Sequence, residues 1–428
     1  MTKTAQKRFF NKTLLPSGMK ILTETIPEVR SVALGFWVRI GSRDEPPKLA
    51  GMSHFLEHLL FKGTKTRSAR EISETFDSLG GELNAYTTKE HTCFYSRLLD
   101  EHLEIGVEVL ADILQNPLFK KKDIESERQV ILEEINLYED SPDERIHDIL
   151  AATLLKEHSL GKPVLGSAAS VKAFSRKDVT QFYSHGYHPN NIVVTAAGSL
   201  KHQGIVDLLE RFFTAPKGEK IVRKNVQPKH NSQVKVVRKK TEQAHLCVGL
   251  PGLTAGHKDR FILTILDKIL GGGMSSRLFQ EIREKRGLAY SIYSYHAFYT
   301  ETGLMAVYAG TRPQKAKEVA TLIKAEIEKI GKSGVSPKEL RRAKEHLKGE
   351  LVLDLENTAH RMARLGQSEL AHGEILSLDE LVNRIDSVTT ADAKRLAREI
   401  FNPEKMAIAV IGPVKEEDFE SNLVERGS

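Results

Sequence analysis

The amino-acid sequence predicts an α/β (α+β) protein built from two similar domains. Its 428 residues exceed the roughly 250–300 at which a single hydrophobic core stops growing. Hydrophobic residues make up 40% of the chain, which is enough for sizeable cores. The order of strand-like and helix-like segments also occurs twice, once in each half. Length and repetition together predict two domains of about 200 residues each.

The first half contains a series of segments with a clear strand or helix pattern. An apolar strand is followed by an apolar helix, a polar helix, an alternating segment, two more helices and a closing apolar strand. In that order these segments are residues 31–41, 52–61, 69–79, 83–98, 101–114, 123–139 and 191–198.

The second half repeats this order. Its segments are residues 245–249, 262–270, 276–285, 289–308, 314–330, a helix that begins at Ser336-Pro337, and 406–412. Ser suits the position that caps a helix, and Pro suits the first helical position. The stretch between the halves is polar and basic and contains two prolines, as a linker does. The predicted division is therefore a domain at 1–215, a linker at 216–233 and a second domain at 234–428.

The apolar helix of the first half carries His54, Glu57 and His58 in the order H-x-x-E-H, the inverted zincin motif. His54 and His58 are four residues apart, so both imidazoles lie on one helix face and can bind the same ion. Glu57 lies on the same side and can reach a metal-bound water as a general base. Apolar residues around the motif bury the helix, and buried His and Glu side chains need partners.

A catalytic zinc needs three protein ligands and one open position. Candidates for the third ligand on the helix at 123–139 are Glu125, Glu127, Glu133, Glu134 and Glu139. An acidic helix can also be a solvated face, but Val130, Ile131 and Ile135 around Glu134 indicate partial burial. Glu127 and Glu134 lie two turns apart on one side, so one can bind the metal while the other orients a histidine.

These motifs resemble those of the insulinase/pitrilysin metallopeptidases, in the mitochondrial-processing-peptidase branch, and the resemblance extends from about Leu14 to Val414. It implies that Glu134, 76 residues after His58, is the third ligand and that Glu127 orients a histidine. It also implies mixed, mainly antiparallel sheets packed with helices. The expected activity is that of a zinc metalloendopeptidase with one Zn²⁺ per chain, acting on oligopeptides or unfolded polypeptide segments.

Asn84 and Ala85, followed by Tyr86, match the family's edge strand that receives the substrate. The resemblance implies that an extended peptide adds to this strand and gives its backbone hydrogen bonds to the edge. Taken alone, Asn84 also suits a turn after two glycines.

Arg283 and Tyr290, within the stretch IREKRGLAY, match a pair in the family's second domain. The resemblance implies that the tyrosine helps to stabilise the tetrahedral oxyanion and that the arginine holds a substrate carbonyl. Without the resemblance, we would expect Arg283 to be a solvated helix residue and Tyr290 to be a packed aromatic ring. The apolar helix at 262–270 has no histidine, so the metal site is expected once per chain.

Family members of this chain length pair as a clamshell around a closed chamber. The resemblance therefore implies a homodimer in which each active site is completed in trans, with peptides as substrates. An alternative is a catalytically silent structural or assembly subunit of the same fold. Such relatives usually lack one or more motif residues, whereas all of the motif residues named above are present in this chain.

Composition limits the remaining classes. The net charge of +6 allows a nucleic-acid-binding protein, but the basic residues are scattered and form no recognised motif, so no nucleic acid is expected. No apolar run approaches the ~20 residues of a membrane span, so no membrane association is expected. The two cysteines, Cys93 and Cys247, are expected in the core of a protein in a reducing compartment. The expected location is the cytoplasm.

Overall fold

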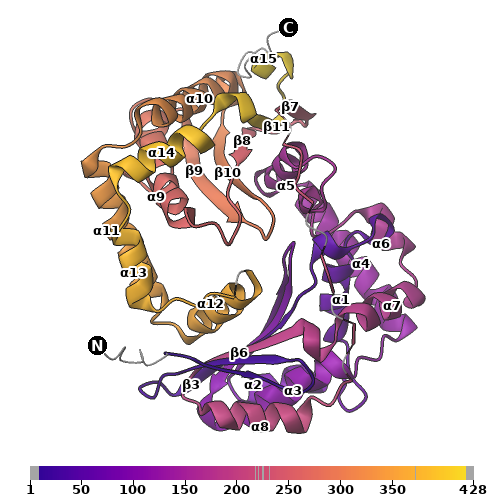
Figure 1. Ribbon diagram of the computed structural model, residues 1–428. Helices are drawn as coiled ribbons and strands as arrows, with labels where there is room; N and C mark the ends of the chain where they lie inside the picture. The colour runs from indigo at the N-terminus through magenta and orange to yellow at the C-terminus, as the bar shows by residue number, and fades with distance from the viewer. Residues whose placement is uncertain are drawn as a thin grey trace, which may run out of the picture. The chain divides into compact units, whose positions relative to one another are not determined.

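The computed structural model describes residues 9–216, 218–219, 221–223, 226–230, 232–371 and 373–420. The chain forms two compact units, each with one mixed sheet packed with helices (Figure 1), which confirms the predicted fold class. Unit 1 consists of Met1–Ile135, Pro163–Lys224 and Leu353–Ser377. Unit 2 consists of Asn136–Lys162, Asn225–Val352 and Leu378–Ser428.

The sheet of unit 1 has the strand order β1-β2-β6-β3-β5-β4. Only β2 and β6 pair in parallel, and the other neighbours are antiparallel. The strands are β1 (Asn11–Leu14), β2 (Lys20–Thr25), β3 (Ser31–Val38), β4 (Glu82–Thr87), β5 (Thr92–Leu99) and β6 (Ile192–Gly198). The alternating segment predicted at 83–98 is thus the hairpin of β4 and β5, and β4 forms an edge of the sheet.

Helices cover both faces of this sheet. In Figure 1, α3 and α8 lie on one face and α12 lies on the other, in agreement with their contacts to β2, β3, β5 and β6. The helices of unit 1 are α1 (Met52–Leu60), α2 (Ala69–Ser78), α3 (Leu103–Gln115), most of α4 (Lys121–Glu139), α6 (Ala168–Ala173), α7 (Arg176–Gly186), α8 (His202–Phe212) and α12 (Thr358–Ala371). Short 3₁₀ turns lie at Ser42–Asp44, Pro47–Leu49, Asp100–His102 and Pro189–Asn191.

Strand β3 is buried on both faces because its apolar residues do not alternate with polar ones. Leu34 and Phe36 join the core under α3, whereas Trp37 packs against Met362 and Leu365 of α12. Gly366 permits this close packing, because a Cβ there would lie 2.1 Å from Trp37 Cε2.

The sheet of unit 2 has the order β7-β11-β8-β10-β9, with only β7 and β11 in parallel. Its strands are β7 (Val234–Arg238), β8 (Ala244–Pro251), β9 (Ala289–Phe298), β10 (Gly303–Thr311) and β11 (Ala407–Gly412). This order matches β2-β6-β3-β5-β4 of unit 1 strand for strand, and β9 is the edge strand that corresponds to β4. The repeat expected from the sequence is therefore present in the sheet topology.

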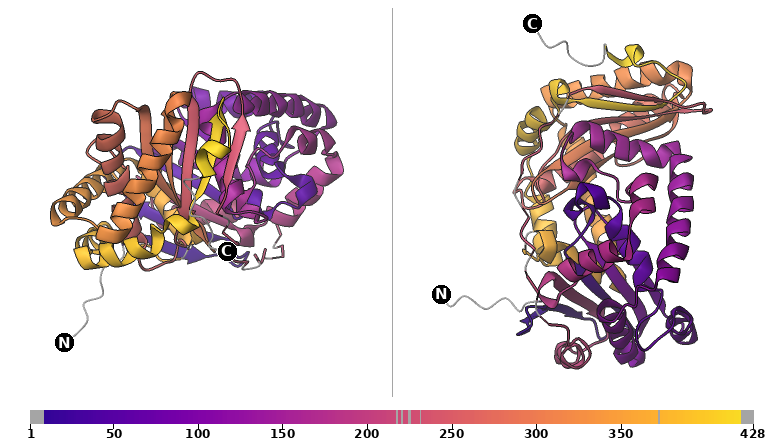
Figure 2. Two further views of the ribbon diagram at one scale, coloured as in Figure 1. Left: turned by 90° about the horizontal axis from the view of Figure 1, so that it is seen from above. Right: turned by 90° about the vertical axis from the view of Figure 1, so that its right-hand side faces the viewer.

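Helices α9 and α10 pack on one face of this sheet and α5 packs on the other, against β8 and β11. Figure 2 shows the layers of each unit from two further sides. The helices of unit 2 are the end of α4, α5 (Pro142–Leu154), α9 (Arg260–Leu270), α10 (Ala316–Ser333), α11 (Pro337–Asp354), α13 (Leu378–Asp386), α14 (Thr390–Ile400) and α15 (Glu417–Glu420). Its 3₁₀ turns lie at Ser159–Gly161, Pro313–Lys315 and Pro403–Lys405.

Most predicted segments correspond to observed elements. The helix expected at 276–285 contains a π-helical stretch, Phe279–Glu284. Several helices were not predicted, among them α5 and α12. Helix α5 comes from the first half of the sequence but packs on the sheet of unit 2, and α12 comes from the second half but packs on the sheet of unit 1. Part of the predicted linker, 216–233, lies outside the described residues, so the domain boundaries stay a prediction. Both cysteines are buried, as expected.

Candidate metal centre

Helix α1 carries the H-x-x-E-H motif and is fixed by both its sequence and its N-terminus. Met52, Phe55 and Leu56 are fully buried in the core of unit 1. The helix starts after Gly51, whose φ of 94° lies in the left-handed region. The carboxylate of Glu45 accepts hydrogen bonds from the backbone N–H groups of Gly51 and Ser53, both at 2.7 Å. It thereby satisfies donors that the first helical turn leaves unpaired.

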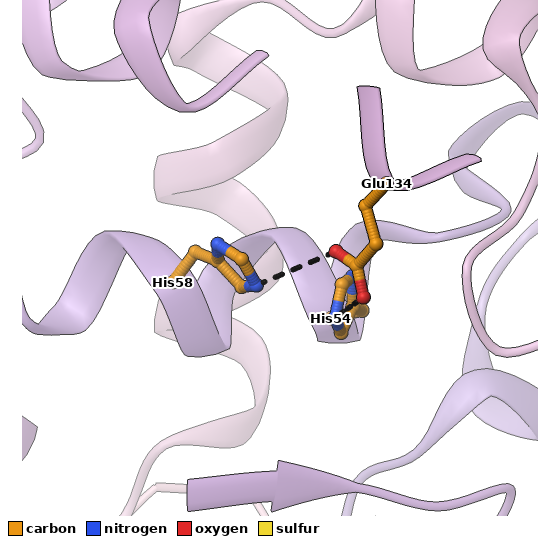
Figure 3. Close-up of side chains that lie close together, drawn as sticks. All are labelled: His54, His58 and Glu134. Carbon is orange, nitrogen blue, oxygen red and sulfur yellow. Dashed lines mark ion pairs between the residues drawn. The ribbon is translucent and has the colours of Figure 1, made fainter. Parts of the chain in front are cut away.

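His54, His58 and Glu134 come together between α1 and α4 (Figure 3). His54 Nε2 lies 3.6 Å from Glu134 Oε1, and His58 Nε2 lies 3.8 Å from Glu134 Oε2. The carboxylate in Figure 3 points toward both rings, one oxygen to each. Within the described ranges, this is the only group of three or more His, Cys, Asp or Glu residues whose donor atoms lie close enough together to bind one metal ion.

The spacing and the unpaired atoms of this group fit a small cation. Tetrahedral zinc with bonds of about 2.0–2.2 Å separates its ligand atoms by roughly 3.3–3.6 Å. Both carboxylate–imidazole distances are close to that range and too long for hydrogen bonds. Glu134 Oε2 is buried without a hydrogen-bond partner, which is costly for a carboxylate oxygen unless a cation neutralises it. Two imidazoles and one carboxylate form a ligand set that suits zinc.

Glu127 lies on the same side of α4 as Glu134, two turns earlier, and holds His58. Its Oε2 atom lies 3.2 Å from His58 Nδ1, and its Oε1 atom lies 2.7 Å from Lys62 Nζ. Burial raises the pKa of Glu127, but the bonds from His58 and Lys62 outweigh it and leave the pKa lowered. A carboxylate at Nδ1 leaves Nε2 of His58 free to face Glu134, the arrangement that orients a metal-binding imidazole.

His54 is the more buried of the two histidines, with 8% of its surface exposed. Burial, followed by the nearby His58, lowers the pKa of His54 to about 4, which favours the neutral, metal-binding form. Its Nδ1 atom is buried without a hydrogen-bond partner, in contrast to Nδ1 of His58.

The carboxylate of Glu57 lies between α1 and the end of β4. Thr87 Oγ1 donates a hydrogen bond of 2.5 Å to Glu57 Oε2. Burial raises the pKa of Glu57 against the opposing effects of Thr87 and His58, and Glu134 raises it further. A carboxylate with a raised pKa, next to His58 and Glu134, has the properties that a general base needs.

The burial of α4 differs in one detail from the expectation. Ile131 and Ile135 are buried, but Val130 is 47% exposed. At 3.6 residues per turn, Val130 lies on the solvent side of Glu134, whereas the two isoleucines lie on the core side. Glu134 therefore stands at the border between core and solvent.

Asn84, Ala85 and Tyr86 lie on the edge strand β4 rather than in a turn. The Asn84 side chain is exposed, and its Oδ1 atom accepts a hydrogen bond of 2.8 Å from the Ala85 N–H group. Tyr86 packs edge-on against Trp37, with ring centroids 6.2 Å apart. Since β4 also carries Thr87, one strand joins the free sheet edge to Glu57.

Arg283 and Tyr290 belong to unit 2, where the two side chains lie against each other. The Arg283 guanidinium lies over the rings of Phe279 and Tyr290, at 4.7 and 4.9 Å from their centroids. Tyr290 is the second residue of the edge strand β9 and is 79% exposed. The two residues are thus adjacent, and an exposed tyrosine hydroxyl is available to a ligand.

Three residues around the metal group were not singled out from the sequence: Glu45, Lys62 and Thr87. Lys62 lies four residues after His58, so helical periodicity could have placed it on the same side. Thr87 lies an even number of residues after Ala85, so strand alternation could have placed both on one face. For Glu45, only an acidic residue shortly before a helix start pointed to a capping role.

Comparisons with known proteins place the chain in a family. Residues 20–168 match the family model described as insulinase (peptidase family M16), and residues 173–347 match the one described as the peptidase M16 inactive domain. An uncharacterized zinc protease of Streptomyces coelicolor is 42% identical over 95% of this chain and 90% of its own length. The uncharacterized zinc protease YmxG of Bacillus subtilis is 41% identical over 93% and 97%.

Two solved structures share the fold. A protease from Helicobacter pylori aligns with a TM-score of 0.88 and 23% identity, over 94% of this chain and 99% of the other. A Pseudomonas fluorescens structure described as a peptidase M16 inactive domain aligns with a TM-score of 0.89 and 21% identity, over 95% and 98%. No helix within the described residues combines the length and apolarity that crossing a membrane requires. The sequence matches to both halves show that this chain belongs to the insulinase family of peptidases, family M16.

Proposed function

We propose that this chain is a zinc-dependent endopeptidase that hydrolyses oligopeptides or unfolded polypeptide segments, with one Zn²⁺ per chain. The observation that carries the proposal is the group of His54, His58 and Glu134, whose facing atoms are too far apart for hydrogen bonds and at the spacing of zinc ligands. The relatives' name of zinc protease supports the same metal and reaction.

Each residue of the group has a part in the proposed reaction. His54, His58 and Glu134 would hold the ion, and Glu127 would keep His58 in the tautomer that binds it. An ion held by these residues would supply Lewis-acid chemistry, which makes a carbonyl more electrophilic and a water molecule more acidic. Glu57 accepts the proton of the attacking water and passes it to the leaving amine. The hydroxyl of Thr87 keeps the Glu57 carboxylate aimed at that water.

The edge strand β4 is the proposed binding place for the peptide backbone. It has a strand neighbour on one side only, and it is continuous with Thr87 beside Glu57. An extended peptide that pairs with β4 would run toward the metal group and compete with Asn84 for the Ala85 N–H group. Backbone pairing selects extended conformation rather than a particular sequence, which suits unfolded segments.

We further propose that the active chain is a homodimer whose sites are completed in trans, as a clamshell assembly would do. The metal group and the Arg283–Tyr290 pair belong to different units of the chain. In the proposed assembly, the Tyr290 hydroxyl of one chain would donate a hydrogen bond to the developing oxyanion of a peptide bound to the other chain, and Arg283 would hold a substrate carbonyl. The chain carries both parts, so no different partner is needed.

The function is tested by peptide hydrolysis with purified protein, with Glu57→Gln as the inactivating change. The variant keeps the size of the side chain and removes its basicity, so we expect zinc binding without cleavage. Glu133→Gln is the matched control, because Glu133 is an exposed glutamate next to Glu134. If the wild-type protein binds zinc and cuts no peptide, the catalytically silent assembly subunit becomes the better assignment.

The assembly is tested by mixing two inactive variants, Glu57→Gln and Tyr290→Phe. Completion in trans leaves one intact site in each mixed dimer, so a mixed dimer regains about half of the wild-type activity and a 1:1 statistical mixture about a quarter. Completion within one chain leaves a defect in every site, and activity stays absent. Labelled chains verify that mixing has occurred, so that a negative result counts against the trans arrangement.

A further inference from the structure

Arg223 connects the loop that caps helix α1 to the turn that follows Thr87, the residue that donates a hydrogen bond to Glu57. It lies in the segment predicted as the linker, yet its side chain is only 11% exposed. Its guanidinium donates to both carboxylate oxygens of Asp44, from Nε at 2.8 Å and from Nη2 at 2.7 Å. Nη2 also donates to the backbone carbonyl of Glu90. A buried, two-pronged contact of this kind is geometrically specific.

The first loop leads from Arg223 to the metal helix. Asp44, which Arg223 binds, precedes Glu45 in the chain. Glu45 is 5% exposed and bonds the N–H groups of Gly51 and Ser53, directly before His54. Gly51 contributes no side-chain cap of its own, so this remote carboxylate is what caps α1.

The second loop leads from Arg223 to the general base. The residues that join β4 to β5 pack on the first loop, because the N–H groups of Ser42 and Arg43 donate to the carbonyls of Thr88 and Lys89 at 3.1 and 3.0 Å. Thr88 follows Thr87, which donates to Glu57. Gly41 lies against this turn so closely that a Cβ would come within 2.4 Å of the Thr88 carbonyl oxygen. Little space is therefore left for either loop to move independently.

We propose that Arg223 is a positioning residue for the peptidase reaction: it locks the 41–45 loop against the 88–91 turn and so fixes Thr87, which holds the Glu57 carboxylate, relative to helix α1. The inference rests on the proposed function. Arg223 acts on the metal group and on Glu57 indirectly, through its contacts with Asp44 and Glu90. Displacements of about 1 Å in a catalytic group can cost up to ~100-fold in rate.

The test compares Arg223→Met with Arg361→Met. Arg361 is a matched control in the same unit, because its guanidinium likewise bonds a buried carboxylate, that of Glu24, and a backbone carbonyl, that of Leu355. Both variants are expected to lower thermal stability. Only Arg223→Met is expected to lower kcat, by about tenfold or more, with KM changed less than about twofold and zinc still bound.

A second readout needs no catalysis. Amide hydrogen exchange of Gly51 and Ser53 is expected to accelerate about tenfold in Arg223→Met and to stay unchanged in Arg361→Met, since only the former releases the loop that carries Glu45. Arg223→Lys keeps the positive charge but loses the two-donor geometry of the guanidinium, so its kcat should be little higher than that of Arg223→Met. The double variant Arg223→Met/Asp44→Asn should lose little more kcat than either single variant, because both changes break the same contact.

The outcomes separate the two proposals. Unchanged exchange at Gly51 and Ser53, or accelerated exchange with an unchanged kcat, would overturn the role of Arg223 while the peptidase assignment stands. A wild-type protein without Glu57-dependent cleavage would overturn the peptidase assignment itself, whatever the exchange data show.

Discussion

His58 Nε2 and Glu134 Oε2 face each other across 3.8 Å without a hydrogen bond between them. The His58 ring is fixed by the contact of its other nitrogen, Nδ1, with Glu127. The position of Glu134 on α4 is fixed by the burial of the neighbouring Ile131 and Ile135. The two groups therefore lie at the spacing of metal ligands, each fixed by contacts of its own, as the proposed zinc site requires.

The two glutamates of α4 are expected to contribute unequally to zinc affinity. Loss of Glu127 removes a group that orients His58, and such a loss typically lowers metal affinity by about 10–100-fold. Loss of Glu134 removes a ligand, so we expect Glu134→Gln to weaken zinc binding by more than about 100-fold and Glu127→Gln by less. Competition with a chromophoric chelator measures both, with Glu133→Gln as the unaffected neighbour. Equal effects of the two changes would contradict the assigned roles.

Thr87→Val is expected to reduce kcat by about tenfold, because a hydrogen bond to a charged group contributes about 1.5–3 kcal/mol. Zinc content should not change, since Thr87 does not belong to the metal group. Thr87→Ser keeps the hydroxyl and should retain most of the activity. Steady-state kinetics on one fluorogenic peptide tests the three proteins together. Full activity of the valine variant would show that Glu57 needs no such support.

The ion pair of Arg277 and Glu339 predicts a pH-dependent contribution to stability. Although burial raises the pKa of Glu339, the bonds from Arg277 and Ser336 outweigh it and lower the pKa to about 2. A carboxyl whose pKa is lowered by folding stabilises the fold above its unfolded value of about 4.5, and this contribution is lost as the pH falls toward 2.

The stability difference between wild type and Glu339→Gln should therefore be largest near neutral pH and shrink between about pH 4.5 and pH 2. Denaturant unfolding at a series of pH values measures it. Glu318→Gln, which removes a half-exposed pair with Lys315, should show little difference at any pH. A constant difference for Glu339→Gln across the range would contradict the assigned ion pair.

Two helical glycines are expected to respond in opposite ways to alanine. A Cβ at Gly366 would lie 2.1 Å from Trp37, so Gly366→Ala should destabilise the fold by about 1–3 kcal/mol. A Cβ at Gly349 of α11 meets nothing within 4 Å, so Gly349→Ala should stabilise it by about 0.5–1 kcal/mol through helix propensity. Thermal unfolding of both variants tests the pair, and a loss of stability in Gly349→Ala would argue against the exposed position of that residue.

Much of the fold was predictable because apolar residues recur with helical or strand periodicity. The segment at 52–61 and the strands at 31–41 and 191–198 were predicted within a few residues, since their apolar character is continuous. Helix α12 was not, because its apolar side toward Trp37 depends on a contact more than 300 positions away in sequence. The π-helical stretch Phe279–Glu284 also gave no signal, because local periodicity does not separate it from an α-helix.

The candidate site likewise has residues that could be predicted from the sequence and residues that could not. Helical spacing brings His54 and His58 together, and the resemblance led to Glu134 and Glu127. The distances among them, however, depend on how α1 packs against α4. Support from Glu45, Thr87 and Arg223 comes from loops whose conformations are set by backbone hydrogen bonds between distant segments, and one sequence contains no periodic signal for such bonds.

The late position of helix α12 in the sequence has a consequence for the synthesis of the chain. Unit 1 includes residues up to Ser377, so its sheet cannot be covered on both faces until most of the chain has left the ribosome. A fragment that ends at the linker would leave the Trp37 side of that sheet without α12 and expose apolar surface that invites aggregation. Completion of unit 1 is therefore a late event of synthesis, and until then the nascent first half exposes the apolar surface that α12 later covers.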